Sequence, residues 1–278
     1  MDILILVDYI MRIATVLLIG LLSFKRNLVD FSGLLMGWII SIPIILLGGW
    51  SWFIIIMLFH FTAGIATKFK YNFKKMLGVA EGKGGARGWR NVLANGIIAL
   101  IAVIIERIIG GQIWILGYLG AIAAAMGDTL ASEIGVLSPS PPRLITKPWI
   151  KVKPGTSGGI TLLGYLMVST SGLTIGVIAH ALGLIHEVNV HQRIWVIFIP
   201  VLASLAGSTI DSVIGATLQA KYVCSVCGSE VESKVHCGKK TKLISGVEFI
   251  DNNVVNIMCS LTGFLVAVLL AATLGFSY

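Results

Sequence analysis

Charged side chains are scarce in this chain of 278 residues: they make up 12% of it, against 56% for hydrophobic side chains. So low a share of charge excludes an ordinary soluble globule and is typical of a protein with several membrane spans. The chain also lacks a long linker or a low-complexity tract. We therefore expect a single integral-membrane domain over residues 1–278.

Eight apolar stretches approach or exceed the roughly 20 residues that a membrane-spanning helix needs. They cover residues 3–22, 31–47, 50–67, 91–109, 112–131, 158–183, 194–219 and 250–275. The second and third stretches are short and meet at two adjacent glycines, so they are expected to form a tight helical hairpin. The sequence predicts an all-α fold, a polytopic transmembrane helix bundle of about eight spans.

A net charge of +8 is compatible with nucleic-acid binding, but the positions of the cations argue against it. Most Lys and Arg residues fall in segments 25–26, 68–90, 143–153 and 221–242, and eight spans place these segments on one side of the membrane. Since Lys and Arg mark cytoplasmic loops, we expect this side to be cytoplasmic, to carry the active face, and to lie opposite both termini. The expected location is the cell membrane of a prokaryote or an organelle membrane of a eukaryote, with membrane lipids and not nucleic acid as partners. Many of these cations then serve only topology and headgroup contact.

A repeated motif provides the strongest functional signal. GDTLASEIG at residues 127–135 returns as GSTIDSVIG at residues 207–215. Helix packing accounts for the glycines but not for Asp128, Glu133 and Asp211, because carboxylates are costly in lipid and usually mark function. We expect the two copies to form one polar site, with these acids as candidate Mg²⁺ ligands, since Mg²⁺ takes one or two carboxylates plus phosphate oxygens.

A glycine-rich basic loop, GKGGARGWRNVLANG at residues 82–96, leads directly into a predicted helix. Glycine lets the backbone approach a ligand, and helix N-termini bind anions. The loop therefore predicts phosphate contacts from Lys83, Arg87 and Arg90, with Asn91 and Asn95 on one helical face pointing into the bundle. It is not a P-loop, because no GKS or GKT occurs and no strand precedes it. The alternative is a flexible basic loop.

Prolines stiffen the next loop, residues 139–161, which ends in PGTSGG before another predicted helix. Lys147 and Lys153 are the expected phosphate partners here, and Thr156 and Ser157 lie at the helix start. The alternative is a simple connector.

Four polar residues, Asp251, Asn252, Asn253 and Asn256, crowd the start of the last span. Helix capping by Asp251 or Asn252 explains one of them but not all four. We interpret the cluster as part of a site.

Three of the four cysteines lie in one loop, residues 220–246, which we expect to form a small cytoplasmic insertion between the last two spans. Cys224, Cys227, His236 and Cys237 have the composition of a closed structural Zn²⁺ site. No βαβ unit accompanies the Cys-x-x-Cys pair, which argues against a thioredoxin-like role. Cys259 lies alone in the last span and is interpreted as packing.

Taken in order, these elements resemble the domain-of-unknown-function 92 family of membrane proteins, which includes transmembrane protein 19 and the plant phytyl-phosphate kinase. The resemblance rests on VLANG, GDTLASEIG, LIT…VKPGTSGGIT, GSTIDSVIGATLQ and DNNVVN, and covers most of residues 80–260. A looser similarity to CTP-dependent polyprenol kinases and CDP-diacylglycerol synthase rests on Gly127-Asp128, Lys153 through Gly158, Asp211-Ser212 and Asp251-Asn252. The long basic signature of the synthase is missing, which counts against cytidylyl transfer.

The resemblance implies an Mg²⁺-dependent membrane kinase that uses a nucleoside triphosphate, CTP on family grounds alone, to convert an isoprenyl monophosphate such as phytyl or geranylgeranyl phosphate to its diphosphate. The expected catalytic and Mg²⁺-binding residues are Asp128, Asp211 and Asp251, with Glu133 as a further ligand. The expected nucleotide contacts are Lys147, Lys153, Thr156, Ser157, Asn252 and Asn253. The expected contacts to the acceptor phosphate are Lys83, Arg87, Arg90, Asn91 and Asn95. A cytidylyltransferase, an ion-coupled transporter and a non-enzymatic scaffold with a zinc-bound loop remain as alternatives.

Overall fold

The fold is a bundle of long helices, seen in a computed structural model that describes residues 3–185 and 189–277. The helices in these ranges are α1 (Ile3–Lys25), α2 (Phe31–Leu47), α3 (Trp50–Lys68), α4 (Tyr71–Met76), the 3₁₀ turn η1 (Lys83–Gly85), α5 (Trp89–Ile109), α6 (Gln112–Gly135), α7 (Leu162–Ala181), α8 (Val190–Thr217) and α9 (Asn252–Thr273). Among the described residues, seven helices are long and apolar enough to cross a membrane, and α2 is a shorter apolar helix of 17 residues. The predicted helical membrane bundle is confirmed in these terms.

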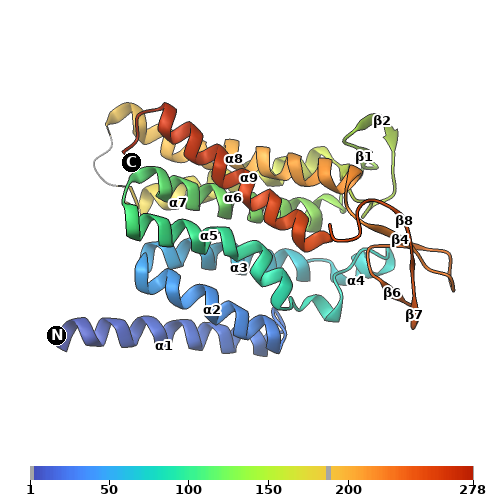
Figure 1. The fold of residues 1–278 in the computed structure, drawn as a ribbon, viewed down its shortest axis with the longest axis horizontal. Coiled ribbons are helices and arrows are strands. Elements are labelled where there is room, and N and C mark those ends of the chain that lie inside the picture. The colour runs from blue at the N-terminus through green and yellow to red at the C-terminus, as the bar shows by residue number, and fades with distance from the viewer. Residues whose placement is uncertain (1–2, 186–188, 278) are drawn as a thin grey trace.

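The long helices run side by side along the longest axis of the molecule (Figure 1). α1 begins and α9 ends at one end of the bundle, and all the strands lie at the other end, which we call the strand end (Figure 1). Hydrogen bonds tie the end opposite the strands together: the Gln112 amide donates to Ser277 Oγ (3.3 Å), and Gln192 Nε2 donates to the Gly275 carbonyl (2.9 Å). Both termini and the short loops thus share one end, as the predicted span count requires. Which end faces the cytoplasm stays a prediction.

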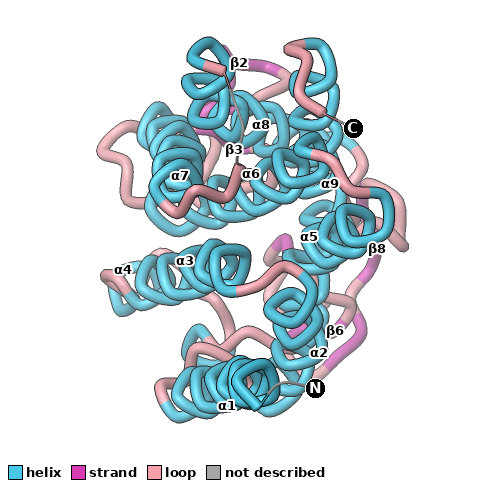
Figure 2. Tube along the Cα trace, turned by 90° about the vertical axis from the view of Figure 1, so that its left-hand side faces the viewer, coloured by secondary structure: helices cyan, strands magenta, loops and turns pink. Residues whose placement is uncertain are grey.

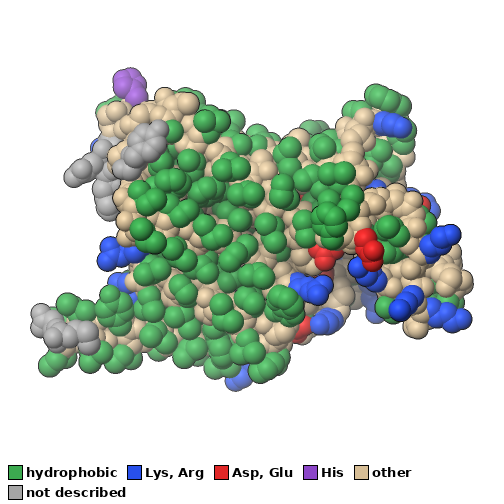
Figure 3. All heavy atoms as spheres, viewed as in Figure 1, with side chains coloured by type: hydrophobic (Ala, Val, Ile, Leu, Met, Phe, Trp, Pro, Cys, Tyr) green, Lys and Arg blue, Asp and Glu red, His purple; other side chains and the backbone are tan. Residues whose placement is uncertain are grey.

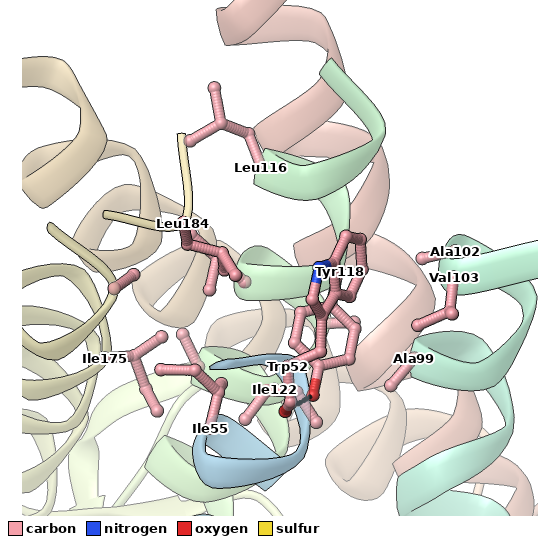
Figure 4. Packing of buried hydrophobic residues seen from close by; sticks show 14 of the residues in the cluster. Trp52, Ile55, Ala99, Ala102, Val103, Leu116, Tyr118, Ile122, Ile175 and Leu184 are labelled. Atoms are coloured by element: carbon pink, nitrogen blue, oxygen red, sulfur yellow. Dashed lines mark hydrogen bonds between the residues drawn. The ribbon is translucent and has the colours of Figure 1, made fainter. Parts of the chain in front are cut away.

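The most deeply buried helix is α6, which contacts α3, α5, α7, α8 and α9. In the view along the helices it lies inside the ring that these neighbours form (Figure 2). Its Tyr118 is completely buried, donates a hydrogen bond to the Trp52 carbonyl (2.6 Å) and packs against the Trp52 ring (Figure 4). Partnering the hydroxyl is what makes a tyrosine tolerable at such a position. Its neighbours on all sides therefore fix the position of α6 and of the acidic residues near its C-terminal end.

Glycines allow α6 and α9 to approach closely. A Cβ added at Gly263 of α9 would lie 2.5 Å from the Gly120 carbonyl oxygen and 2.6 Å from Ala124 Cβ, both on α6. Small residues at a helix crossing let backbones pack together in lipid, where no hydrophobic force drives helices together. The small residues of α6 are thus explained by packing.

Short strands occupy the long loops, and the all-α prediction did not include them. Their bounds in the described residues are β1 (Arg143–Leu144), β2 (Lys147–Lys151), β3 (Gly159–Ile160), β4 (Lys221–Val223), β5 (Glu230–Val231), β6 (Val235–His236), β7 (Lys239–Lys240) and β8 (Lys242–Ser245). They pair antiparallel in the orders β2-β1-β3, β5-β4-β8 and β6-β7. The sheets are too short to leave a clear alternation in the sequence, which is why the apolar pattern predicted helices alone.

Hydrophobic side chains cover the long flank of the bundle seen in Figure 3, and Lys and Arg gather at the strand end, with a few at the other end. α1 is the most exposed of the long helices, since 6% of its most apolar stretch is buried within the protein. An exposed apolar belt of this extent fits a lipid environment and not water.

The close crossing of α6 and α9 gives a first prediction. Gly263→Ala places a methyl group against the α6 backbone, and overpacking of this kind costs about 1–3 kcal/mol. We expect a lower melting temperature in detergent. The matched control is Gly37→Ala, also in a helix, where an added Cβ meets nothing within 4 Å; it should melt at or above the wild-type temperature. Equal melting of the two variants would contradict the packing role.

Candidate active site

A polar cavity of about 300 Å³ opens at the strand end of the bundle. It is bounded by the last turns of α6 and α8, the first turns of α7 and α9, and the loop at residues 155–161. Its polar lining residues are Glu81, Arg87, Asn91, Asp128, Thr129, Ser132, Glu133, Thr156, Ser157, Thr161, Tyr165, Ser208, Asp211, Ser212, Gln219, Glu232, Asn252 and Asn256. The two copies of the repeated motif therefore share one site, as the sequence suggested.

Asp128 and Asp211 are brought together at the base of this cavity. Their carboxylate oxygens and the sulfur of Cys259 all lie within 4.8 Å of one another. Asp211 Oδ2 is buried and, within the described residues, has no hydrogen-bond partner. A buried carboxylate oxygen left without a donor is costly and calls for a cation or a proton.

The motif glycines create this meeting. An added Cβ at Gly207 of α8 would lie 2.6 Å from Ala124 Cβ and 2.7 Å from the Cys259 carbonyl oxygen. At Gly127 of α6 it would collide with Ser204 Oγ of α8 and would lie 3.3 Å from Val168 Cα of α7. The glycines bring α6 and α8 close enough for the acids that follow them to meet, so the packing interpretation of the repeat is confirmed, and the functional role of the polar residues stays a prediction.

Cys259 is also part of this environment, which the sequence gave no reason to expect. Its sulfur donates weakly to the Ala124 carbonyl (3.6 Å). A thiol that keeps its proton for this bond is a poor metal ligand, since the thiolate is the ligand form.

Glu133 has a different role from the two aspartates. Its Oε2 accepts from Lys74 Nζ (2.5 Å), and its Oε1 accepts from Arg87 Nη2 (2.9 Å) and Thr67 Oγ1 (2.8 Å). Lys74 is fully buried and also donates to the Ala66 and Thr67 carbonyls. Both oxygens of Glu133 already bind cations of the chain, so the prediction of Glu133 as an Mg²⁺ ligand is wrong.

The glycine-rich loop is folded against the α1–α2 connection. The Arg87 amide donates to the Leu28 carbonyl (3.0 Å), and the Asp30 amide donates to the Arg87 carbonyl (3.0 Å). Lys83 pairs with Asp30 (2.7 Å) and leaves 72% of its side chain exposed. Of the three cations predicted to hold the acceptor phosphate, only Arg87 lines the polar cavity.

Arg90 lies outside the cavity, stacked on Trp89 and 4.0 Å from Asp251. Asp251 caps α9: its Oδ1 accepts from the amides of Asn253 (3.0 Å) and Val254 (3.1 Å). Asn253 also bonds the cap through its side chain, at 3.4 Å. The structure therefore separates Asp251 and Asn253 from the Asp128–Asp211 pair, while Asn252 lines the cavity as predicted.

In the proline-rich loop, too, some of the predicted site residues line the cavity and others do not. Lys147 is exposed in β2, on a hairpin that extends away from the bundle (Figure 1), and Lys153 is exposed beside it. Neither lines the cavity, so the predicted contacts from these lysines have no support in the geometry. Thr156 and Ser157 do line it, and Ser157 Oγ donates to Glu232 Oε1 at 2.5 Å.

A second, apolar cavity of about 120 Å³ lies between α1, α2, α3 and α5. Asn91, Arg87 and Thr129 line both cavities, so the two adjoin at these side chains. Asn95 lines only the apolar one and donates to the Asn91 carbonyl (2.9 Å). The polar cavity at the strand end thus lies next to an apolar one inside the bundle.

The remaining cluster, Cys224, Cys227, His236 and Cys237, is brought together as predicted, with its donor atoms within 4.8 Å of one another. It lies in the segment that carries Glu232.

Sequence reasoning missed several lining residues, among them Glu232, Glu81, Tyr165, Ser208 and Gln219. Ser208 was recoverable, because it stands in the second motif where Asp128 stands in the first. Glu232 and Glu81 lie in irregular segments whose sequence has no feature that points to the cavity.

Comparison with known proteins gives a consistent result. The family described as integral membrane protein DUF92 matches residues 14–264. Protein PGR of Arabidopsis thaliana is 36% identical over 275 residues, covering 90% of this chain and 92% of that protein. An uncharacterized membrane protein of Methanocaldococcus jannaschii is 28% identical, covering 78% of this chain and 86% of its own. The protein named VTE6, chloroplastic, of Arabidopsis thaliana is 26% identical, over 81% of this chain and 62% of its own. No solved structure matches the chain.

The buried ion pairs give an asymmetric prediction. Glu133→Gln leaves Lys74 as a buried cation without a carboxylate, and breaking a buried pair in this way costs about 3–5 kcal/mol. Lys74→Met leaves Glu133 with Arg87 and should cost clearly less. We expect the melting temperature in detergent to fall much further for Glu133→Gln than for Lys74→Met. The reverse order would show that Lys74 is not held by Glu133.

Acid should selectively weaken the contact that holds the glycine-rich loop. The hydrogen bonds from Lys83, Ser32 and the Gly33 amide lower the pKa of Asp30 from 3.8 to about 2. A lowered pKa in the folded state contributes stability above the unfolded value, and this contribution is lost as the pH falls through about 4 to 2.

Asp30→Asn removes this charge and keeps a good helix cap. The wild type should therefore melt above the variant at neutral pH, and the difference should shrink below about pH 4. The melting temperatures of both proteins are measured across this pH range. A difference in melting temperature that stays constant down to about pH 2 would contradict the role of the Asp30 charge.

Proposed function

Because the chain belongs to the DUF92 family of integral membrane proteins, we propose that it is a membrane-bound kinase that phosphorylates an isoprenyl monophosphate at the strand end of its bundle. The product is the isoprenyl diphosphate, and the donor is a nucleoside triphosphate. The family resemblance supports the reaction class, and the site geometry supports the kind of substrate.

One observation carries the proposal: the Asp128–Asp211 pair faces a polar cavity that adjoins an apolar one. A phosphorylated isoprenoid has the same two parts, a highly charged head and a hydrocarbon tail. With the phosphate in the polar cavity, the tail fits the apolar cavity between α2 and α3, which it enters near Leu34 and follows toward Ile56 and Phe53. Because the tail leaves an equally apolar bilayer, this cavity positions the tail and adds little hydrophobic driving force.

The charge of the cavity favours a divalent cation as a companion of the phosphates. Within the described residues, Asp128, Asp211 and Glu232 form no ion pair, and Arg87 is the one basic side chain of the lining. Polyphosphate would be repelled by such a surface on its own. Two carboxylates with an unpartnered buried oxygen fit Mg²⁺, a hard cation that prefers oxygen ligands. Bound there, Mg²⁺ would supply neutralisation of phosphate charge.

The other lining residues position the two phosphates. Asn91 and Arg87, at the junction of the cavities, are placed to hold the acceptor phosphate where head and tail meet. Thr156 and Ser157, on the loop before α7, are placed to contact the donor. A phosphate acceptor is already nucleophilic, so the reaction relies on positioning and charge stabilisation and needs no general base.

The position of the acids disfavours a transporter. Between Asp128 and the end of α6 the helix rises about 10 Å, and between Asp211 and the end of α8 about 9 Å. Both acids therefore lie short of the middle of a hydrocarbon core about 30 Å thick, where transporters place their sites. A cytidylyltransferase remains an alternative, which its release of pyrophosphate would distinguish. CTP as donor rests on family resemblance alone.

The aspartate pair provides the test of the proposal. Asp128→Asn and Asp211→Asn should each lower turnover by at least about 100-fold, the usual loss when an electrostatic partner of the transition state is removed. The assay uses purified protein in detergent with isoprenyl monophosphates, each nucleoside triphosphate, and Mg²⁺ present or absent. The expected product is the lipid with one added phosphate.

The matched control is Glu106→Gln, an acid-to-amide change in α5 outside both cavities, which should keep its activity. Wild-type protein without turnover on any isoprenyl monophosphate would refute the reaction. Full activity in either aspartate variant would remove the pair from the mechanism.

A further inference from the structure

The segment between α8 and α9 gathers a second group of side chains of the types that bind metals, away from the aspartate pair. Within it, Nδ1 of His236 lies 3.5 Å from Cys227 Sγ and 3.3 Å from Cys237 Sγ, and all four donor atoms, with Cys224 Sγ, fall within 4.8 Å of one another. Tetrahedral zinc bonds of about 2.3 Å to sulfur and 2.0–2.1 Å to nitrogen place neighbouring donors roughly 3.5–3.8 Å apart. The four residues thus already stand at nearly the spacing of a zinc site.

The first ligand pair is held on a tight turn. The Gly228 amide donates to the Cys224 carbonyl (2.9 Å), and the Val226 amide points at Cys224 Sγ (3.4 Å). A backbone amide directed at sulfur stabilises negative charge there, which suits a thiolate ligand. This turn therefore presents Cys224 and Cys227 on one side.

The second pair lies on a two-residue hairpin between β6 and β7. Its central residues, Cys237 and Gly238, both have positive φ, +51° and +75°. Such turns favour Asn-Gly or Asp-Gly, because few other residues adopt this conformation without strain. Cysteine at the first position has no advantage for the backbone, and its side chain is directed at the other three donors. The presence of cysteine where the turn favours Asn or Asp is therefore explained by its sulfur.

Apolar packing contributes little to the shape of this segment. Of the described residues 221–245, only Tyr222 and Cys224 are buried. A unit of this size without an apolar core needs a disulfide or a metal ion, and all its cysteines are free.

We propose that Cys224, Cys227, His236 and Cys237 bind one Zn²⁺, which fixes this segment over the polar cavity. Three thiolates and one imidazole favour zinc over the hard cations Mg²⁺ and Ca²⁺. Glu232 lies between the two ligand pairs, lines the cavity and accepts the hydrogen bond from Ser157. Zinc therefore holds Glu232 at the cavity and, through Ser157, steadies the loop at residues 155–159.

Metal content tests the site directly. The full chain is purified in detergent from cells grown with zinc. Mass spectrometry should then find about one Zn²⁺ per protein chain, because the four ligands make one tetrahedral site. Cys227→Ser and Cys237→Ser should each lower zinc affinity by at least about tenfold, in competition with a chelator. Ser225→Ala, in the same turn, and Glu232→Gln should retain the metal.

A wild-type protein free of zinc, one that carries iron in its place, or one with a disulfide among these cysteines would overturn the proposal. So would a Cys227→Ser variant that binds zinc as tightly as the wild type.

Hydrogen exchange of the wild type tests the coupling without any variant. Removal of zinc by a chelator should accelerate amide exchange in residues 221–245 and 155–159 but not in α6, and added Zn²⁺ but not Mg²⁺ should reverse it. Unchanged exchange at residues 155–159 would refute the link to the cavity. These measurements involve no turnover, so their outcome is separate from that of the proposed kinase reaction.

Discussion

Carboxylates buried in an apolar bundle need positive partners, and this protein meets that need in two different ways. Glu133 is satisfied within the chain, by the buried Lys74 and by Arg87. Asp128 and Asp211 have no such cation among the described residues and leave one oxygen without a partner. The first arrangement is complete and holds the helices. The second is incomplete, and an incomplete buried charge pair is unstable unless a ligand completes it.

Close helix packing is what allows the second arrangement to exist. Gly127 and Gly207 bring α6 and α8 together, and Gly263 brings α9 against α6. The aspartates stand at different positions of the two motif copies, so they meet across the interface and are not equivalent. A larger residue at these crossings would separate the helices and with them the two acids.

The sequence predicted the helices and the aspartate pair because both depend on local, regular features: long apolar runs and a repeated motif. It did not predict what depends on pairing between distant segments. Lys74 stands in a basic run that suggests exposure. It is buried instead, because the Glu133 carboxylate and two carbonyls accept its hydrogen bonds. Lys147 follows prolines that suggested a stiff approach to the site, but β2 pairs with β1 in a hairpin that extends outward. Glu232 reaches the cavity only because the segment around it folds back, and no local pattern encodes that path.

Arg87 links the two halves of the proposed site, and its partners indicate how a phosphate could enter. It bonds Glu133, whose side chain is 8% exposed, and Glu81, whose side chain is 41% exposed. Glu133 is also held by Lys74, whereas Glu81 has no second cation among the described residues. Ion pairs exposed to water are weak, and buried ones are costly to separate. A lipid phosphate arriving at the junction of the cavities would therefore displace Glu81 from Arg87 and leave the bond to Glu133 in place. Arg87 can then bind the substrate and keep its ion pair with Glu133 on α6, the helix that carries Asp128. The glycine-rich loop and the aspartate pair therefore keep their relative positions while the acceptor is bound.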